Sequence, residues 1–366
     1  MRTVLVLDTT AVTTALPMRD CIDAVRDALA ELARDRYRQF PRFLLEAPET
    51  PVKIGLMPTF RAGDTSLWGV KTVTVSPQNR ERGLDSHQGA MLVLDGATGE
   101  LRAVVDATAI TGLRTAATSA AATLALARWD TKEVAILGTG HQARCHIEAM
   151  RTILPEARFS IWGCSIASAE ALADAMGAKA CASAEAAVAD ADVICTVTAS
   201  PKPILAPEWI KPGCHINAVG ASSPKARELG SAIIAGAELF VDSREQAPSN
   251  AANTSWHGPK ARSPTRISAP RSVRCSRAQS AGARTRRPSP SSSRSASRSR
   301  ISPPPIAPSA TRKTSASASA FPGRAGRFGL TPQRGVLENA CAFDQMRICA
   351  AEHEQRRASM SATEKQ

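Results

Sequence analysis

The sequence lacks the cysteine patterns of a disulfide framework or a zinc module. Its nine cysteines are odd in number, and no two of them form a CxxC pair. Paired, regularly spaced cysteines are typical of small secreted domains and of zinc sites. We therefore expect reduced, mostly buried thiols in a cytoplasmic protein. His141 and His146 would point away from each other on a helix, so we expect no metal site.

Long apolar runs are also missing. The apolar start at residues 4–7 is interrupted by Asp8, which leaves it too short for the core of a signal peptide. No run approaches the roughly 18 residues that indicate a membrane-spanning helix. The sequence therefore predicts a soluble, intracellular protein with no membrane partner.

Acidic residues are absent from one long block. Residues 246–336 contain no Asp or Glu, whereas residues 246–334 contain 17 Lys and Arg. Residues 1–245 carry 25 basic against 28 acidic residues, so the excess positive charge of the chain belongs to this block. Because residues 248–320 are mostly Ser, Arg, Pro and Ala, they cannot bury enough apolar surface to fold, and we expect 248–366 to be disordered.

Two kinds of pattern precede this tail. In residues 1–115, an amphipathic helix at 17 to about 36 is followed by the strand-like runs VKIGLM, SLWGVKTVTV and AMLVLDGATGELRAVVDA, which predicts an α+β domain. A small-residue helix, 108 to about 127, leads into residues 116–247. There strands alternate with helices from EVAILG to ELFVD, which predicts an α/β domain with a Rossmann-type doubly wound parallel sheet.

The stretch LGTGHQA lies where a strand ends and a helix begins. Gly138 permits a tight turn, Gly140 lets a pyrophosphate approach the backbone, and Ala143 replaces a third glycine. The N-terminus of the following helix supplies unpaired N–H donors to an anion. In this context the motif predicts dinucleotide binding, although a bare structural turn is the alternative.

The end of the next strand bears on the choice of cofactor. It reads Trp162, Gly163, Cys164, Ser165 and offers no carboxylate to hold a ribose 2′-hydroxyl, and no arginine to hold a 2′-phosphate. NAD or NADP therefore stays open, and the missing carboxylate favours NADP.

Three cations flank the predicted cofactor cleft. Lys71 interrupts an apolar strand, Arg114 lies in the first turns of a small-residue helix, and Arg42 precedes a strand. Each could instead be a solvated surface residue, and Lys71 could alternate outward. Together they suit a small carboxylate substrate, because guanidinium groups bind carboxylates bidentately and a partly desolvated lysine can exchange protons.

Several long motifs, in order and at matching spacing, resemble the ornithine cyclodeaminase/mu-crystallin family. They are GVKTVTVSP with SHQG, ATAITGLRTAATSAAAT, ILGTGHQA, TVTASP and HINAVGASSPKAREL, and the resemblance covers about residues 1–247. It implies a homodimer in which residues 1–115 form the substrate-binding and dimerisation domain and residues 116–247 form an incomplete Rossmann domain.

The resemblance also implies roles for individual residues. Arg42, Lys71 and Arg114 would bind the substrate carboxylate, and Lys71 would be the catalytic proton-transfer group. The residues that would line a nicotinamide cofactor are Ser86, Gly138, Thr139, Gly140, His141, Gln142, Ser165, Thr198 and Val219.

One departure from the family bears on the reaction. Ornithine cyclodeaminases carry an aspartate after NAVG, where this chain has Ser222 in NAVGASS. A serine hydroxyl is no general base near neutral pH without a partner. The resemblance therefore favours hydride transfer at the C=N or C–N carbon of a small imino or amino acid, as in ketimine or pyrroline-2-carboxylate reductases and amino-acid dehydrogenases. Ornithine cyclodeamination and non-enzymatic binding of a small molecule are the alternatives.

The tail has an explanation in the reading frame. Family members continue with a segment similar to SLGIALEDLAAA. Written in GC-rich codons and read one nucleotide later, LGIALEDLAAA becomes SASRSRISPPP, which is residues 295–305. We infer that the chain beyond about residue 247 is the family's C-terminal third in a shifted frame, and that this product has low stability and little or no activity. Sequencing the gene checks this: a single insertion or deletion near codon 248 should restore SLGIALEDL.

The competing interpretation of the tail is a genuine basic arm that binds nucleic acid. On the frame-shift interpretation, the basic residues bind nucleic acid only non-specifically.

Overall fold

The computed structural model describes residues 3–221, 227–241, 336–338, 340 and 348–351. Met1–Val273 and Gly329–Gln366 form one compact unit, to which all of these residues belong. The second unit, Arg274–Phe328, lies outside the described residues, as does most of the predicted tail. No described helix combines the length and apolar composition needed to span a membrane.

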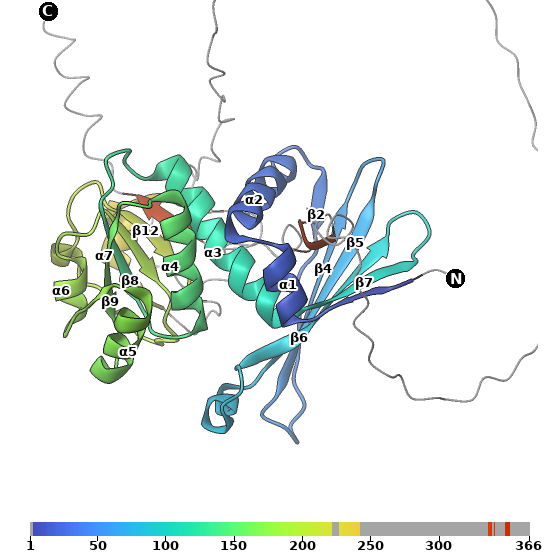
Figure 1. Ribbon diagram of the computed structural model, residues 1–366, viewed down its shortest axis with the longest axis horizontal. Coiled ribbons are helices and arrows are strands. Elements are labelled where there is room, and N and C mark those ends of the chain that lie inside the picture. The colour runs from blue at the N-terminus through green and yellow to red at the C-terminus, as the bar shows by residue number, and fades with distance from the viewer. Residues whose placement is uncertain (1–2, 222–226, 242–335, 339, 341–347, 352–366) are drawn as a thin grey trace, which may run out of the picture. The chain divides into compact units, whose positions relative to one another are not determined.

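The first sheet has seven strands and is mostly antiparallel (Figure 1). Its strands run in the order β1-β7-β6-β5-β4-β2, with β3 paired to β4, and only the β1–β7 pairing is parallel. The bounds are β1 Leu5–Leu7, β2 Tyr37–Gln39, β3 Phe43–Leu45, β4 Lys53–Arg61, β5 Leu67–Val75, β6 His87–Asp95 and β7 Leu101–Asp106. The predicted strands and the β6–β7 hairpin at GATGE are confirmed.

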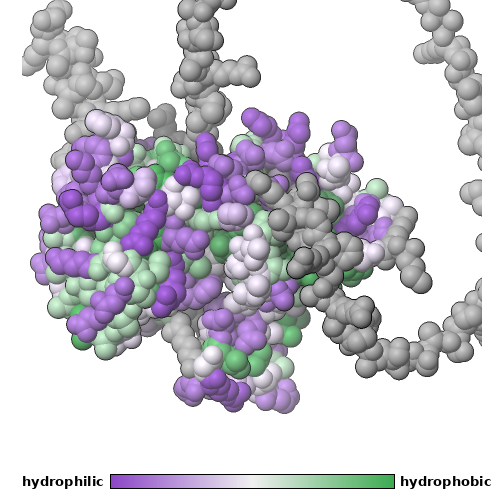
Figure 2. All heavy atoms as spheres, in the orientation of Figure 1, coloured by the Kyte–Doolittle hydropathy of each residue, from purple (hydrophilic) through white to green (hydrophobic). Residues whose placement is uncertain are grey.

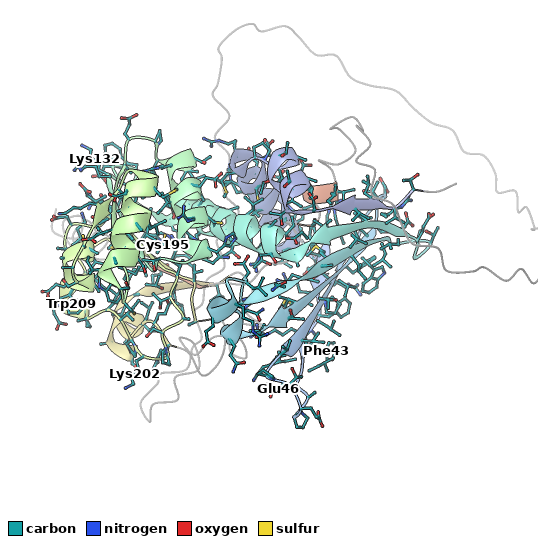
Figure 3. All side chains as sticks on the ribbon, turned by 60° about the horizontal axis from the view of Figure 1, so that its bottom comes forward. Phe43, Glu46, Lys132, Cys195, Lys202 and Trp209 are labelled. Atoms are coloured by element: carbon teal, nitrogen blue, oxygen red, sulfur yellow. The ribbon has the colours of Figure 1, made fainter. Side chains whose placement is uncertain are left out.

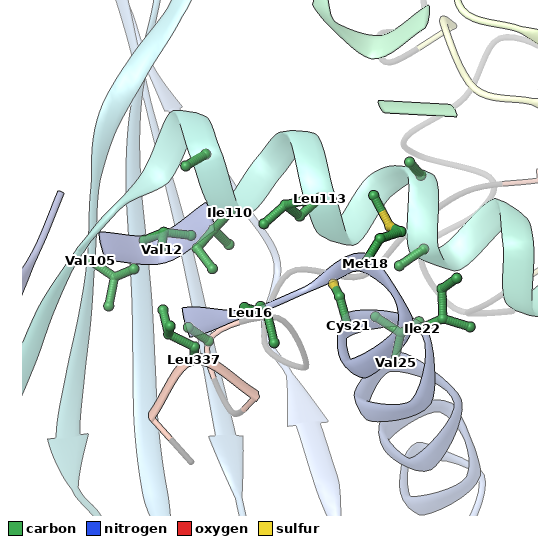
Figure 4. Close-up of a cluster of buried hydrophobic side chains, with 14 of the residues drawn as sticks. Val12, Leu16, Met18, Cys21, Ile22, Val25, Val105, Ile110, Leu113 and Leu337 are labelled. Atoms are coloured by element: carbon green, nitrogen blue, oxygen red, sulfur yellow. The ribbon is translucent and has the colours of Figure 1, made fainter. Parts of the chain in front are cut away.

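Helices pack against this sheet and form its core. They are α1 Thr9–Ala15, α2 Met18–Leu32 and α3 Ala107–Leu126, with the 3₁₀ helix η1 at Pro77–Arg82 in the β5–β6 connection. Figure 4 shows how Ile22 and Val25 of α2, with Ile110 and Leu113 of α3, share one apolar cluster. The stretch predicted as a small-residue helix is α3, whose Ala, Ser and Thr side chains let neighbouring elements approach closely.

The second sheet is the Rossmann-type sheet. Its order is β10-β9-β8-β11-β12-β14-β13, and the strands from β10 to β12 are parallel, as the alternating pattern predicts. The strands are β8 Glu133–Leu137, β9 Arg158–Trp162, β10 Lys179–Ala180, β11 Val193–Thr196, β12 His215–Ala218, β13 Glu238–Val241 and β14 Ile348–Ala351. The helices are α4 His141–Ile153, α5 Ile166–Met176, α6 Ala184–Val188, η2 Pro207–Trp209 and α7 Ser231–Gly236.

Two short segments of the tail differ from the expectation of disorder throughout 248–366. Residues 336–338 and 340 are helical, and the buried Leu337 lies in the first core beside Val12 and Leu16 (Figure 4). β14 pairs antiparallel with both β12 and β13, so the sheet is mixed at this edge. The apolar residues in these segments, such as Leu337 and Ile348, are of the kind that pack in protein interiors.

α3 joins the two sheets. It contacts β6 on one side and α4 and β12 on the other. Ser119 Oγ lies 3.0 Å from Nε2 of the buried His146 in α4, and Asn217 Nδ2 of β12 donates to Thr123 Oγ1 at 3.0 Å. The domain boundary predicted at residue 115 therefore falls inside α3, a helix that packs against elements of both sheets. The division into two domains stays a prediction.

Figures 2 and 3 show the outer surface of the second sheet and the direction in which its parallel strands run. Hydrophilic and hydrophobic residues are interspersed over the visible face of α4–α6 (Figure 2). Figure 3 labels Lys132 before β8, Cys195 within β11 and Lys202 beyond β11, and these three lie in that order across the sheet. Because the strands are parallel, their carboxyl ends all lie on the side of the sheet where Lys202 is found, and this side is called the carboxyl edge below.

Candidate functional site

The residues predicted to hold a cofactor in the second sheet follow the carboxyl ends of its parallel strands. Gly138–Gln142 follows β8, Ser165 follows β9, Thr198 follows β11 and Val219 follows β12. In an open α/β sheet, ligands bind outside this edge, where the strand order reverses. That reversal lies between β8 and β11 here. The topology therefore brings these residues to one edge of one sheet.

The glycine-rich turn has the geometry that a dinucleotide site requires. Gly138 has φ +134°, where a side chain is strained, and a Cβ there would lie 2.9 Å from the carbonyl oxygen of Val197. Gly140 is the N-cap of α4, and no atom lies within 4 Å of where its Cβ would be. The side that a Cβ would fill is thus open to an approaching pyrophosphate beside the free N–H groups of the helix.

Thr139 and Ser165 shape the adjoining part of the edge. Thr139 packs on Gly163, where a Cβ would come within 2.6 Å of Thr139 Cγ2. Ser165 Oγ accepts from the backbone N–H of Ser168 at 3.3 Å and caps α5. Cys164, between Gly163 and Ser165 in the sequence, is exposed. No carboxylate stands at residues 162–165, so the preference for NADP stays a prediction.

Thr198 and Val219 occupy the other half of the edge. The Val219 N–H donates to the carbonyl of Thr196 at 2.9 Å, and its side chain is buried. The Thr198 hydroxyl and its backbone N–H both donate to Glu228, each at 2.7 Å. These bonds fix the chain immediately beyond β11 and β12.

Lys71 of β5 is buried, with only 3% of its surface exposed, so the alternative of an outward-facing lysine is wrong. It shares the buried face of β5 with Gly69 and Val73. Its Nζ lies 3.5 Å from Thr111 Oγ1 on α3. The ammonium group therefore faces the helix that joins the two sheets.

α3 links Lys71 to the glycine-rich turn. The Thr111 carbonyl accepts from Gln142 Nε2 at 3.3 Å, and Gln142 lies in the first turn of α4. The next residue, Gly112, has no side chain, and a Cβ there would overlap the His141 ring. His141 Nε2 in turn lies 3.7 Å from Cys145 Sγ, whose pKa burial raises to about 12. One turn of α3 thus touches both the buried lysine and the start of α4.

Helix spacing and strand register relate the two predicted arginines to Lys71. Arg114 is buried and follows Thr111 by three residues on α3, which places it on a neighbouring part of the same helix face. Arg42 immediately precedes β3, whose first residue Phe43 pairs with Leu56, and the adjacent Met57 pairs with Lys71. Arg42 is half-buried, and this burial lowers the pKa of its guanidinium. A partly desolvated guanidinium remains charged and favours an anionic partner.

Ser86 lies at the mouth of the β5–β6 hairpin. Its Oγ is 3.0 Å from His87 Nδ1, and its carbonyl accepts from the Ser76 N–H at 2.9 Å. Thr108, at the start of α3, donates to the carbonyl of His87 at 3.1 Å. The contact of its neighbour His87 with Thr108 places this part of the chain beside the start of α3, and the role of Ser86 toward a cofactor stays a prediction.

The sequence interpretation missed Thr111 and Glu228. Thr111 lies in the motif ITGLRTAA and Glu228 in KAREL, both of which carry the family resemblance. Neither residue type signals its role by spacing, because the contacts that define the roles join distant elements. Ser222, the departure from the cyclodeaminase pattern, lies outside the described residues. Within those residues, no three His, Cys, Asp or Glu side chains form a metal-binding group.

The parallel sheet, its reversal of strand order and its glycine-rich turn define a Rossmann-type α/β protein. The chain belongs to the ornithine cyclodeaminase/mu-crystallin family, whose model matches residues 2–254. The ketimine reductase mu-crystallin of Rattus norvegicus is 41% identical over 196 residues, which cover 53% of this chain and 62% of that protein. The chain therefore spans about three fifths of the length of that relative.

Solved structures of similar fold carry ligands at their sites. A Δ1-pyrroline-2-carboxylate reductase from Thermococcus litoralis, in complex with NADH and L-proline, is 29% identical with a TM-score of 0.64, over 68% of this chain and 79% of that one. An archaeal alanine dehydrogenase dimer with bound NAD is 31% identical with a TM-score of 0.62, over 67% of this chain and 76% of that one.

Proposed function

We propose that this chain carries the site of an NAD(P)-dependent oxidoreductase that transfers a hydride at the C=N or C–N carbon of a small imino or amino acid. One observation carries the proposal. Thr111 of α3 contacts Lys71 Nζ through its hydroxyl and Gln142 of the glycine-rich turn through its carbonyl. A proton-transfer group and a cofactor seat are thereby supported by the same turn of one helix.

The substrate end is built from the three cations. Arg42 and Arg114 bind the carboxylate, since guanidinium groups form paired bonds with carboxylate oxygens. Lys71 contributes to the same carboxylate site and gives a proton to the substrate nitrogen in the reductive direction. Burial of its ammonium group excludes water from this proton transfer.

The cofactor end is built from the edge of the second sheet. The open side of Gly140 and the N–H groups of α4 fit a pyrophosphate, with Gly138, Thr139, His141 and Gln142 shaping the turn. Ser165 lies toward the adenosine, and Thr198, Val219 and Ser86 lie toward the nicotinamide. The nicotinamide supplies or accepts the hydride when it is bound. The absence of a carboxylate at residues 162–165 supports NADP over NAD.

The relatives narrow the substrate class and suggest an assembly. One is named a ketimine reductase and another a Δ1-pyrroline-2-carboxylate reductase; both names denote reduction of a C=N bond, and the second places a carboxylate on the carbon of that bond. The archaeal alanine dehydrogenase is described as a dimer. We extend both features to this chain and propose a homodimer that reduces a ketimine of this kind.

Steady-state turnover tests the proposal. The chain and a version with its reading frame restored near codon 248 should be assayed with pyrroline-2-carboxylate, piperideine-2-carboxylate, and pyruvate plus ammonia, following oxidation of NADPH or NADH. We expect turnover of at least one imino acid by the restored chain and little or none by the present one. Equal activity of the two chains would contradict the proposed frame shift.

The same assay separates the alternative functions. Conversion of ornithine to proline and ammonia, without turnover of any imino acid, would identify a cyclodeaminase and overturn the choice made from Ser222. Tight binding of a cofactor without turnover by the restored chain would indicate a non-enzymatic binder.

A further inference from the structure

Glu228 is a fully buried acidic residue that the sequence interpretation did not assign. It lies between β12 and α7, and none of its surface is exposed. Its Oε1 accepts from the backbone N–H and the hydroxyl of Thr198, each at 2.7 Å. Its Oε2 accepts from the Thr196 hydroxyl at 2.8 Å and from the Gly220 N–H at 2.6 Å. One carboxylate therefore holds the ends of two neighbouring strands.

A carboxylate matches this set of donors, because each of its oxygens accepts from one backbone N–H. Its two oxygens together offer about four acceptor sites and no donor. A glutamine in the same place would present one oxygen and one NH₂ group, so it would oppose the Gly220 N–H with a second donor. Hydrogen bonds to a charged acceptor are roughly twice as strong as neutral ones, which makes the four bonds a rigid connection.

The backbone around Glu228 is fitted to this contact. A Cβ at Gly220 would lie 2.5 Å from Glu228 Oε1, so a glycine is required for the close approach. The Glu228 carbonyl also accepts from the Ile204 N–H at 2.9 Å, which ties down the far end of the loop after β11. The loops 197–204 and 219–220 are thereby joined through one residue.

On the proposed function, these loops belong to the half of the sheet that binds the nicotinamide. A doubly wound sheet contains two mononucleotide-binding halves, and the glycine-rich turn after β8 defines the first. β11 and β12 lie across the reversal of strand order, in the second half. Thr198 and Val219, the residues expected at the nicotinamide, are the ones that Glu228 and its partners fix in place.

We infer that Glu228 is a positioning residue that holds the Thr198 and Val219–Gly220 loops in the conformation that receives the nicotinamide. The inference rests on the proposed function. It requires that loss of the carboxylate weakens contacts to the nicotinamide half of the cofactor. Contacts to the adenosine and pyrophosphate, made by the first half of the sheet, should remain.

Binding of two probes to the full chain tests this inference. NADH spans both halves of the site, whereas ADP-ribose lacks the nicotinamide; if the chain prefers NADPH, the 2′-phosphorylated pair replaces them. In Glu228→Gln we expect roughly tenfold weaker NADH binding and unchanged ADP-ribose binding, because the lost bonds lie in one half. Glu133→Gln, at the opposite edge of the same sheet, is the matched control, and it should bind both probes as the unmodified chain does.

Each other outcome also decides. Unchanged NADH affinity in Glu228→Gln, or equal weakening of NADH and ADP-ribose in a folded protein, would overturn the inference. If Glu228→Gln does not fold, Thr196→Val removes one bond and leaves the charge. Selective weakening of NADH in that variant supports the inference, and unchanged NADH binding overturns it. Failure of both the unmodified chain and the frame-restored chain to bind either probe would instead refute the proposed function.

Discussion

The two sheets position their functional residues in different ways. In the second sheet, the candidate residues stand in loops beyond the ends of parallel strands, where the topology gathers them at one edge. In the first sheet, Lys71 stands in the middle of an antiparallel strand, and its ammonium group faces α3, which covers that side of the sheet. On the proposed function, strand order gathers the cofactor residues, whereas the packing of one helix buries the proposed catalytic group.

Among these predictions, replacement of Lys71 in the first sheet should have the largest effect on turnover. Lys71→Met removes the proton-transfer group but fits an apolar surrounding, so turnover of the frame-restored chain should fall by roughly 10² to 10⁴. Dinucleotide binding should change little, because all of the proposed cofactor residues except Ser86 follow strands of the second sheet. Lys53→Met, at an exposed lysine of β4 paired with Glu46, is the control. Lost cofactor binding in Lys71→Met would contradict this separation of roles.

The second sheet should confer sensitivity to acid through His215. Burial lowers the pKa of this β12 residue to about 4 from its ordinary 6.5. The unfolded chain therefore takes up a proton that the folded chain excludes. This contribution to stability is complete above about pH 6.5 and is lost as the pH falls toward 4, by up to about 3 kcal/mol.

Urea unfolding at several pH values measures this effect. His215→Gln keeps a donor for Asn217 but does not titrate, so its stability should fall less between pH 6.5 and 4 than that of the unmodified chain. His141→Gln, at an exposed histidine, should retain the full pH dependence. Identical pH profiles for His215→Gln and the unmodified chain would refute the prediction.

The glycine-rich turn should respond to a single methyl group. Gly138→Ala places a Cβ against the Val197 carbonyl at a strained φ, so the turn must shift and dinucleotide affinity should fall about tenfold. Gly99→Ala, in the β6–β7 turn of the first sheet, also has a positive φ but meets no atom within 4 Å. It should lose some stability and keep its affinity, as fluorescence titration with NADPH can determine. Equal affinities of the two variants would contradict a cofactor seat at this turn.

The smallest expected effect concerns the choice between NAD and NADP. Cys164→Asp adds a carboxylate at an exposed position after β9, where it should repel a 2′-phosphate and accept from a 2′-hydroxyl. The ratio of NADPH to NADH affinity should fall several-fold, and Cys164→Asn serves as the uncharged control. If the ratio of NADPH to NADH affinity is the same in both variants, the 2′ group of the adenosine ribose does not lie near residue 164.

The same contrast explains how much the sequence could predict. The glycine-rich turn and the strand–helix alternation are local signals, so the parallel strands of the second sheet could be predicted from the sequence, whereas the roles of the residues at their carboxyl ends stay predictions. Burial of Lys71 was not, because alternation along β5 does not reveal which face α3 covers. Glu228 was missed because its four partners come from segments 8 to 32 residues away in the chain. β14 and Leu337 were missed because the disorder inferred from the composition of residues 248–320 was extended to the end of the chain.

The central claim is that a carboxylate substrate binds among three cations beside the nicotinamide, on the turn of α3 that carries Thr111. Titration of the NADPH-loaded chain with L-proline, followed by the fluorescence of the reduced cofactor, tests this without turnover. The account predicts a saturable change that disappears in Arg114→Met and is not produced by proline amide, which keeps the ring amine but lacks the carboxylate. A chain that binds NADPH but gives no response to proline, or responds equally to the amide, would contradict it.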